Sequence, residues 1–126
     1  MELYIGGFAQ GKLRYVRKKY PQFTDADVAD GGEVREFCRE SKIWNHLHLW
    51  VKRRLSEGGE PEKELEQMLA ACPDSIIICD EIGNGIVPLD HAEREYREYT
   101  GRLLCRLAEE ATCVERIICG VGLRVK

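Results

Sequence analysis

Apolar residues recur along this chain at two spacings, which together predict strands that alternate with helices. Short apolar runs typical of strands occur near residues 3–5, 28–30, 43–45, 75–79, 114–119 and 123–126. We expect helices over residues 12–20, 33–40, 47–57, 61–72 and 90–111. The run at 43–45 also suits the opening of the helix that follows it. Strands alternating with helices predict an α/β fold, with a mostly parallel sheet covered by helices on both faces.

Several residues indicate where these elements begin and end. Pro21 cannot continue the first helix, and Pro61 suits the first turn of another. Asp90, followed three residues later by Glu93, resembles a capping box that opens the last helix. A tight turn at residues 120–122 separates the last two strands, so we expect the final strand to pair antiparallel at one edge of the sheet.

Size and charge narrow the class of protein. A chain of 126 residues is expected to form one domain, residues 1–126. The net charge of −3 argues against nucleic acid as the main partner. The longest apolar stretch, residues 76–79, is too short to cross a membrane, and no secretory signal is evident at the N-terminus. We therefore expect a cytoplasmic protein.

Glycines and a lysine follow the first predicted strand in a pattern typical of a phosphate-binding loop. In the motif G-x-x-x-x-G-K-[ST], glycines let backbone N–H groups surround phosphate oxygens, and the lysine adds a mobile positive charge. Leu13 replaces the hydroxyl residue that ligates Mg²⁺, so the loop favours nucleotide binding more strongly than turnover. A glycine-rich strand-to-helix turn without a ligand is the simpler alternative. The predicted nucleotide-binding residues are Gly6, Gly7, Phe8, Ala9, Gln10, Gly11, Lys12 and Leu13.

Two acidic residues, Asp80 and Glu81, directly follow the apolar strand at 75–79. A carboxylate at the end of a buried strand can hold Mg²⁺ and orient the attacking group beside a phosphate loop. We therefore predict Lys12, Asp80 and Glu81 as catalytic residues, and Asp80 and Glu81 as the Mg²⁺ ligands. A pair of solvated loop acids is the alternative interpretation.

Histidines and cysteines give weaker signals. His46 and His48 follow a predicted strand, where a neutral imidazole can accept a proton and a charged one can bind phosphate. Their spacing fits neither one helix face nor a zinc motif, so helix capping or packing is the preferred interpretation. His91 is expected to be exposed. The six cysteines include no C-x-x-C pair, and we expect most of them to be buried, reduced thiols.

Residues 80–88, with the sequence D-E-I-G-N-G-I-V-P, resemble a motif of the bifunctional adenosylcobinamide kinase/adenosylcobinamide-phosphate guanylyltransferases. The corresponding family pattern is N-E-V-G-x-G-I-V-P, and the tail at 120–126 is similar to the family's G-x-G-x-x-x-K. The family's loop, G-G-x-x-S-G-K-S, is similar at Gly6, Gly7, Gly11 and Lys12. Residues 48–51 resemble the family's T-L-W segment, and Asn45 stands where the family has an acid. An aromatic/Arg pair and a G-R pair also match, at Tyr96-Arg97 and Gly101-Arg102.

The resemblance implies a RecA-like, three-layer P-loop fold and a role in cobalamin biosynthesis. It implies ATP- or GTP-dependent phosphorylation of the corrinoid adenosylcobinamide on its aminopropanol hydroxyl, with Mg²⁺, and a homo-oligomer, a trimer in the family. The family also transfers GMP through a histidine in a His-His pair. This chain has no such pair, so we expect the guanylyltransferase half to be missing. A non-catalytic nucleotide-binding sensor or assembly partner is the alternative function, and another small P-loop phosphotransferase is a third.

Overall fold

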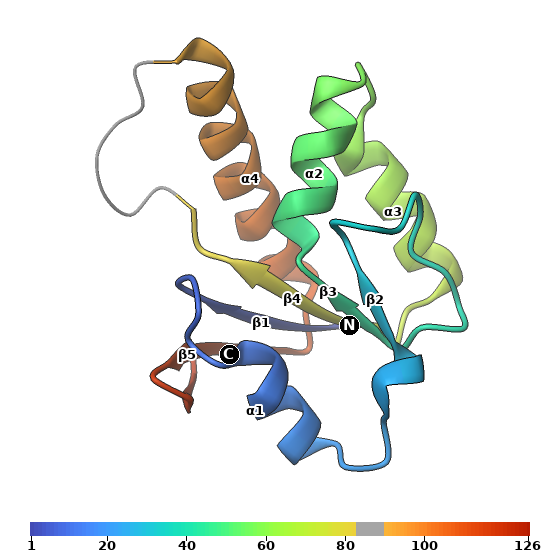
Figure 1. Ribbon diagram of the computed structural model, residues 1–126, viewed down its shortest axis with the longest axis vertical. Helices are drawn as coiled ribbons and strands as arrows, with labels where there is room; N and C mark the ends of the chain where they lie inside the picture. Colours follow the sequence, from blue (N-terminus) through green and yellow to red (C-terminus); the bar gives the residue numbers. More distant parts are fainter. Residues whose placement is uncertain (83–89) are drawn as a thin grey trace.

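A six-stranded sheet between two helical layers forms the frame of the computed structural model, which describes residues 1–82 and 90–126 (Figure 1). The strands follow the spatial order β2-β3-β4-β1-β5-β6. Their bounds are β1 Glu2–Gly6, β2 Val28–Asp30, β3 Ile43–Asn45, β4 Ile76–Asp80, β5 Cys113–Ile118 and β6 Val121–Arg124. The helices are α1 Lys12–Lys19, α2 Leu47–Ser56, α3 Pro61–Ala71 and α4 His91–Glu110, with a 3₁₀ turn at Asp25–Asp27.

The pairing of the strands confirms the predicted fold class. Among the described residues, strands β1 to β5 pair in parallel, and β6 runs antiparallel against β5. The segment 43–45 is a strand rather than the opening of α2. Because parallel strands end at the same edge, the residues that follow β1, β2, β3 and β4 meet at one side of the sheet. This architecture is that of a P-loop NTPase-like fold.

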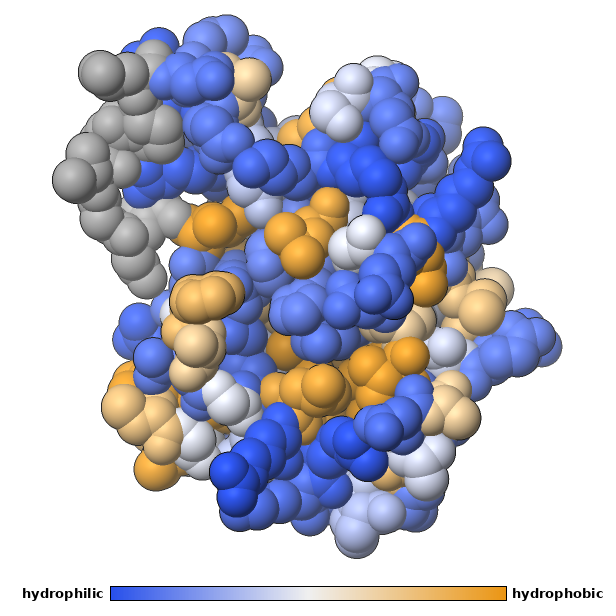
Figure 2. All heavy atoms as spheres, in the orientation of Figure 1, coloured by the Kyte–Doolittle hydropathy of each residue, from blue (hydrophilic) through white to orange (hydrophobic). Residues whose placement is uncertain are grey.

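Alternating residues of the strands supply two separate cores. Ile77 and Cys79 of β4 face the layer of α2, α3 and α4, whereas Ile76 and Ile78 face α1. In β4 these side chains are almost fully buried, as expected of a strand covered on both faces. Each large side chain buried in this way contributes roughly 1.5–3 kcal/mol to folding. Figure 2 shows mostly hydrophilic side chains over the upper helices and apolar atoms gathered between them and α1.

Residues 33–40 form turns rather than the predicted helix. In a helix, backbone carbonyls accept hydrogen bonds from amides of the same segment, but here several of them accept from side chains of α2. Trp50 donates its indole N–H to the carbonyl of Arg35 at 3.0 Å, and Arg53 donates to the carbonyls of Gly32 and Val34. Phe37 stacks on Trp44, with ring centroids 5.1 Å apart, and packs against Trp50. Tertiary contacts therefore override the local helical preference.

The six cysteines are all free thiols, but the expectation that most are buried is wrong. Only Cys79 and Cys113 are buried, and burial raises the pKa of the Cys79 thiol to about 12. Cys38, Cys105 and Cys119 are exposed because they lie on a loop, on the outer side of α4 and in a turn. No helix in the described part of the chain is both long and apolar enough to span a bilayer.

The turn between β5 and β6 lies at Cys119 and Gly120, one residue earlier than the sequence predicts. Both residues have positive φ, 50° and 77°, and Ile118 pairs with Val121 across the turn. Two positive φ values are typical of a type I′ hairpin turn, in which Asn-Gly is the preferred pair.

Replacing Cys119 by asparagine is therefore expected to stabilise the protein by roughly 0.5–1 kcal/mol, because asparagine adopts positive φ more readily than cysteine. Urea unfolding of Cys119→Asn and wild type measures the difference. Cys119→Val serves as the matched control and is expected to be destabilising, since β-branched residues resist this conformation. Equal stability of the three proteins would show that the turn does not limit folding stability.

Candidate functional site

The predicted phosphate loop joins β1 to α1, and positive φ at Ala9 and Gly11 shapes its backbone. Gly11, the residue before α1, has a φ of 80° and provides no side-chain cap. The first backbone hydrogen bond of α1 runs from the Tyr15 N–H to the Gly11 carbonyl at 2.9 Å. Among the described residues, no side chain caps the amides of the first helical turn. An uncapped helix end of this kind favours negative charge.

The turn between β5 and β6 supports the loop from the side. Gln10 accepts two hydrogen bonds from this turn, from the Gly120 N–H to its carbonyl at 2.8 Å and from the Cys119 N–H to its Oε1 at 2.7 Å. Phe8, at the outer part of the loop, is 86% exposed. The loop is therefore fixed through Gln10, while its outer part faces solvent.

Lys12 and Asp80 form an ion pair at the mouth of the loop. Lys12 Nζ lies 2.6 Å from Asp80 Oδ1 and donates to the Gly7 carbonyl at 2.6 Å. Their side chains are only 7% and 13% exposed. The register of β1 and β4, which pairs Gly6 with Asp80, brings the two residues together. A phosphate that binds in the loop would therefore compete with Asp80 for the lysine.

Glu81, the second predicted acid, lies apart from this pair. Its carboxylate binds Arg116 of β5, with Oε1 3.0 Å from Arg116 Nε. Within residues 1–82 and 90–126, no three His, Cys, Asp or Glu side chains are grouped as a ready metal site. Mg²⁺ is commonly held by one or two carboxylates together with substrate phosphates and water, and the Asp80 carboxylate suits that role.

His48 is buried against Asp80 and contacts it twice. Its Nδ1 accepts the Asp80 N–H at 3.1 Å, and its Nε2 lies 3.4 Å from Asp80 Oδ2. Burial lowers the pKa of His48, although the Asp80 charge opposes this effect. Because Nδ1 accepts the Asp80 N–H, the proton of the neutral imidazole lies on Nε2, where it faces the carboxylate. His48 has the packing role that the sequence favours, and it orients Asp80.

His46 contacts Asp30 rather than capping α2. It occupies the N-cap position of the helix, but its side chain makes no capping hydrogen bond, so the capping interpretation is wrong for this residue. Its Nδ1 lies 3.1 Å from both carboxylate oxygens of Asp30. The rings of His46 and His48 meet edge to face, with centroids 5.6 Å apart. Sequence reasoning missed Asp30, although its position between a predicted strand and a Gly-Gly turn was an available signal.

These residues form a row along the carboxyl ends of β2, β3 and β4 that reaches the phosphate loop, and we call it the edge row. It consists of Asp30, His46, His48, Asp80 and Lys12. Buried Asn45 ends β3 beside it, and Glu81 follows it on the side of β5. His91 is exposed, as expected, and pairs with Glu95 on α4.

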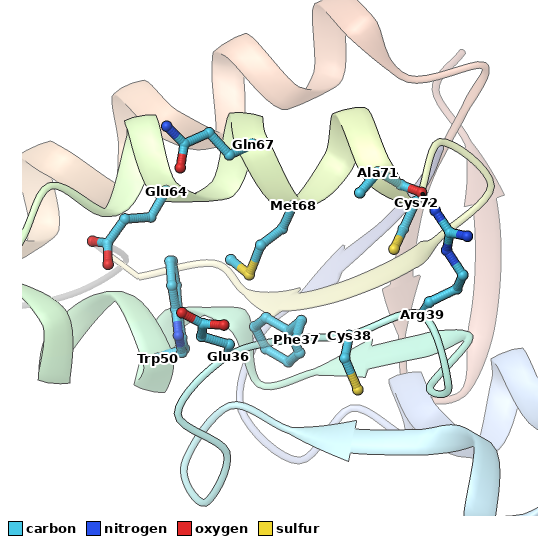
Figure 3. A pocket seen from close by; sticks show the side chains of 10 residues that line it. All are labelled: Glu36, Phe37, Cys38, Arg39, Trp50, Glu64, Gln67, Met68, Ala71 and Cys72. Atoms are coloured by element: carbon cyan, nitrogen blue, oxygen red, sulfur yellow. Dashed lines mark hydrogen bonds between the residues drawn. The ribbon is translucent and has the colours of Figure 1, made fainter.

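A separate groove of about 330 Å³ lies between residues 36–39, α2 and α3 (Figure 3). Met68 points into it from α3, opposite Phe37 and Trp50. Two of its polar side chains bind backbone carbonyls: the Trp50 indole donates to Arg35, and Arg39 donates to Ala71 at 3.2 Å. No member of the edge row lines this groove. The edge row and the phosphate loop are therefore the candidate active site.

Comparisons with known proteins place the chain in a family. Residues 32–125 match the family model described as cobinamide kinase / cobinamide phosphate guanyltransferase. The bifunctional adenosylcobalamin biosynthesis protein CobU of Salmonella typhimurium (strain LT2) is 32% identical over 69 residues, which are 52% of this chain and 38% of that protein. CobU of Escherichia coli (strain K12) is 31% identical over 67 residues, which are 50% and 37%.

These matches differ in extent. The matched segments span well under half the length of each curated relative. The family model covers most of this chain, although it begins after the phosphate loop. The chain belongs to the cobinamide kinase / cobinamide phosphate guanyltransferase family.

Proposed function

We propose that this protein binds a nucleoside triphosphate, ATP or GTP, and uses it to phosphorylate the hydroxyl of adenosylcobinamide in adenosylcobalamin biosynthesis. Family membership supports the biosynthetic role. The observation that carries the kinase proposal is the position of Lys12, held 2.6 Å from Asp80 beneath an uncapped helix end. A charge placed there can follow negative charge as it develops on the transferred phosphoryl group.

We propose a distinct task for each residue of the site. Backbone amides of the loop and of the first turn of α1 would hold phosphate oxygens, and Lys12 would exchange Asp80 for the terminal phosphate. Asp80, oriented by His48, would then be the residue that holds Mg²⁺. That ion, when bound, supplies neutralisation of the phosphate charge. The guanylyltransferase half is proposed to be absent, because this sequence carries no His-His pair.

Titration calorimetry with ATP and GTP, with and without Mg²⁺, tests the binding step. Incubation with adenosylcobinamide and γ-labelled triphosphate tests the transfer step. We expect heat of binding with at least one triphosphate and label on the corrinoid. Absence of heat with both nucleotides would overturn nucleotide binding, and binding without labelled corrinoid would overturn the kinase.

A non-catalytic nucleotide-binding protein is the second candidate, and Leu13 favours it. The Leu13 side chain packs at the rim of the core between α1 and the sheet, so this position provides packing instead of a hydroxyl for Mg²⁺. In such a protein, nucleotide affinity would not change when Mg²⁺ is chelated.

Mg²⁺ dependence can be expressed as the nucleotide affinity measured with Mg²⁺ divided by the affinity measured with a chelator. Replacing Leu13 by serine is expected to raise this ratio about tenfold, because one hydrogen bond or metal contact of ordinary strength contributes about 1.4 kcal/mol. Leu13→Ala is the matched control, because it removes the same packing and adds no hydroxyl. Calorimetry in both buffers gives the ratio. Equal ratios for the serine and alanine variants would show that position 13 does not reach the metal.

We also propose that the chain forms a homo-oligomer, a trimer by resemblance to its family. Strand β6 lies at an open edge of the sheet, and the side chains of Val121, Leu123 and Val125 are exposed on it and beyond its end. An exposed apolar edge strand is a surface that proteins usually cover. Sedimentation equilibrium of the wild-type protein measures the mass, and a monomer at all concentrations would overturn this proposal.

A further inference from the structure

We propose that His46 is the catalytic residue that takes the proton from the attacking hydroxyl, and that Asp30 positions its ring. The inference rests on the proposed kinase function and assigns the proton acceptor for that reaction. Phosphoryl transfer to an alcohol gains from a base that accepts the hydroxyl proton as the new bond forms. Two features of the edge row point to this imidazole.

The first feature is the pairing of His46 with Asp30. Asp30 is held independently of the histidine, since its Oδ1 accepts the Gly32 N–H at 2.8 Å. A carboxylate fixed in this way keeps the imidazole proton on Nδ1, where the 3.1 Å contacts lie. The lone pair is then on Nε2, which forms no hydrogen bond with another of the described residues. The side chain is 40% exposed, so a substrate hydroxyl can approach it.

The second feature is the backbone of His46. Its φ of 55° and ψ of 46° are left-handed, a conformation that is unfavourable for a residue with a side chain. The Asn45 and His46 carbonyls bind backbone N–H groups of Gly31, Leu49 and Trp50, which holds this conformation. A Cβ at Gly31 would collide with the His46 carbonyl. Strain maintained by such close packing is typical of functional positions.

The other histidine of the edge row does not fit this role. His48 is 9% exposed, and both of its ring nitrogens face Asp80. His46 therefore offers the open nitrogen, while His48 links it to the phosphate site. The route from His46 to Lys12 passes through two side chains, His48 and Asp80. An alcohol between His46 and a triphosphate on Lys12 would have its base on one side and its electrophile on the other.

Transfer of the γ-phosphoryl group to the hydroxyl needs no reagent besides the nucleoside triphosphate and the acceptor alcohol. The hydroxyl oxygen of the acceptor attacks the γ-phosphorus of the nucleoside triphosphate and forms the new P–O bond. The bond from that phosphorus to the β–γ bridging oxygen breaks, and its electron pair leaves with the nucleoside diphosphate. The hydroxyl proton passes to His46 Nε2, the Asp30 carboxylate stabilises the resulting imidazolium, and the proton is later released to water.

His46→Gln is the sharpest variant, since glutamine keeps a polar side chain near Asp30 but cannot take the proton. We expect kcat for corrinoid phosphorylation to fall by about 100-fold or more, with nucleotide Kd within about threefold of wild type. His91→Gln, on the exposed start of α4, is the matched control and should retain wild-type kcat. Circular dichroism confirms that each variant is folded.

A spectroscopic measurement tests the geometry without relying on activity. A long-range ¹H–¹⁵N spectrum of the wild-type protein should show the His46 proton on Nδ1, and Asp30→Asn should reduce that preference. Equal kcat for His46→Gln and wild type, or a wild-type proton on Nε2, would overturn the role of His46. A wild-type protein that transfers no phosphate would instead overturn the proposed function, and this inference with it.

Discussion

Replacing Lys12 by methionine is expected to weaken ATP or GTP binding by about 100-fold. Its ammonium group lies at the mouth of the phosphate loop, 2.6 Å from both the Gly7 carbonyl and Asp80 Oδ1. A hydrogen bond to a charged group contributes about 1.5–3 kcal/mol, and each 1.4 kcal/mol corresponds to a factor of ten in Kd. Calorimetric titration of the variant and the wild type measures the loss.

The same substitution leaves Asp80 without its cation in a nearly buried position. We therefore expect Lys12→Met to lose about 2 kcal/mol of folding stability as well. The double variant Lys12→Met/Asp80→Asn separates the two effects, since it removes both charges. It should regain most of the stability in urea unfolding but not the nucleotide affinity. Wild-type affinity in folded Lys12→Met would contradict the proposed phosphate site.

Gly6→Ala is expected to have the second large effect, a loss of about 3 kcal/mol in the free energy of unfolding. A Cβ at Gly6 would lie 2.5 Å from the Ile117 carbonyl oxygen of β5. That oxygen belongs to the backbone of a neighbouring strand, so it cannot move without separating β1 from β5. The phosphate loop begins at the same residue, and nucleotide affinity should fall together with stability. Urea unfolding and calorimetry measure the two losses.

Gly7→Ala is the matched control for this prediction. Its nearest neighbour would be the Gln10 Cγ at 3.6 Å, an ordinary contact with a flexible side chain. We expect this variant to unfold within about 0.5 kcal/mol of the wild type. If both alanine variants had the same stability, the close approach of β1 and β5 at Gly6 would not limit the fold.

The order of strands and helices could be predicted from the sequence because each element carries its own apolar spacing. Strand β4 and helix α4 illustrate this, since one is a continuous apolar run and the other begins at a capping residue. The path of residues 33–40 could not be predicted in the same way. It depends on Phe37 stacking on Trp44 and on Arg53 binding distant carbonyls, contacts that appear only when α2 and β3 are in place.

The candidate site was predictable only in part. The pattern of glycines predicted the phosphate loop, and the end of an apolar strand predicted Asp80 as a site residue. The interaction of Glu81 with Arg116 and that of His46 with Asp30 both join segments that are neighbours only in the folded sheet. Residues 83–89, which carry most of the motif that resembles the family, lie outside the described residues.

Asn45 stands where the family pattern has an acid, and the order of the strands shows what this difference means for the charge of the site. The pattern has an acid at the position of Asn45 and an asparagine at that of Asp80. In the structure these positions end β3 and β4, which are adjacent strands. This edge of the sheet therefore carries a carboxylate in either arrangement, and the loss of the acid at position 45 does not by itself remove the negative charge from the site.

The two hydrogen bonds that Gln10 accepts from the β5–β6 turn have a consequence for assembly. They join the phosphate loop to the hairpin whose outer strand is open to contact. If an oligomer interface on β6 stabilises the turn in this conformation, it also stabilises the loop. Thermodynamic reciprocity then requires that nucleotide occupancy tighten subunit association by the same factor by which association tightens nucleotide binding.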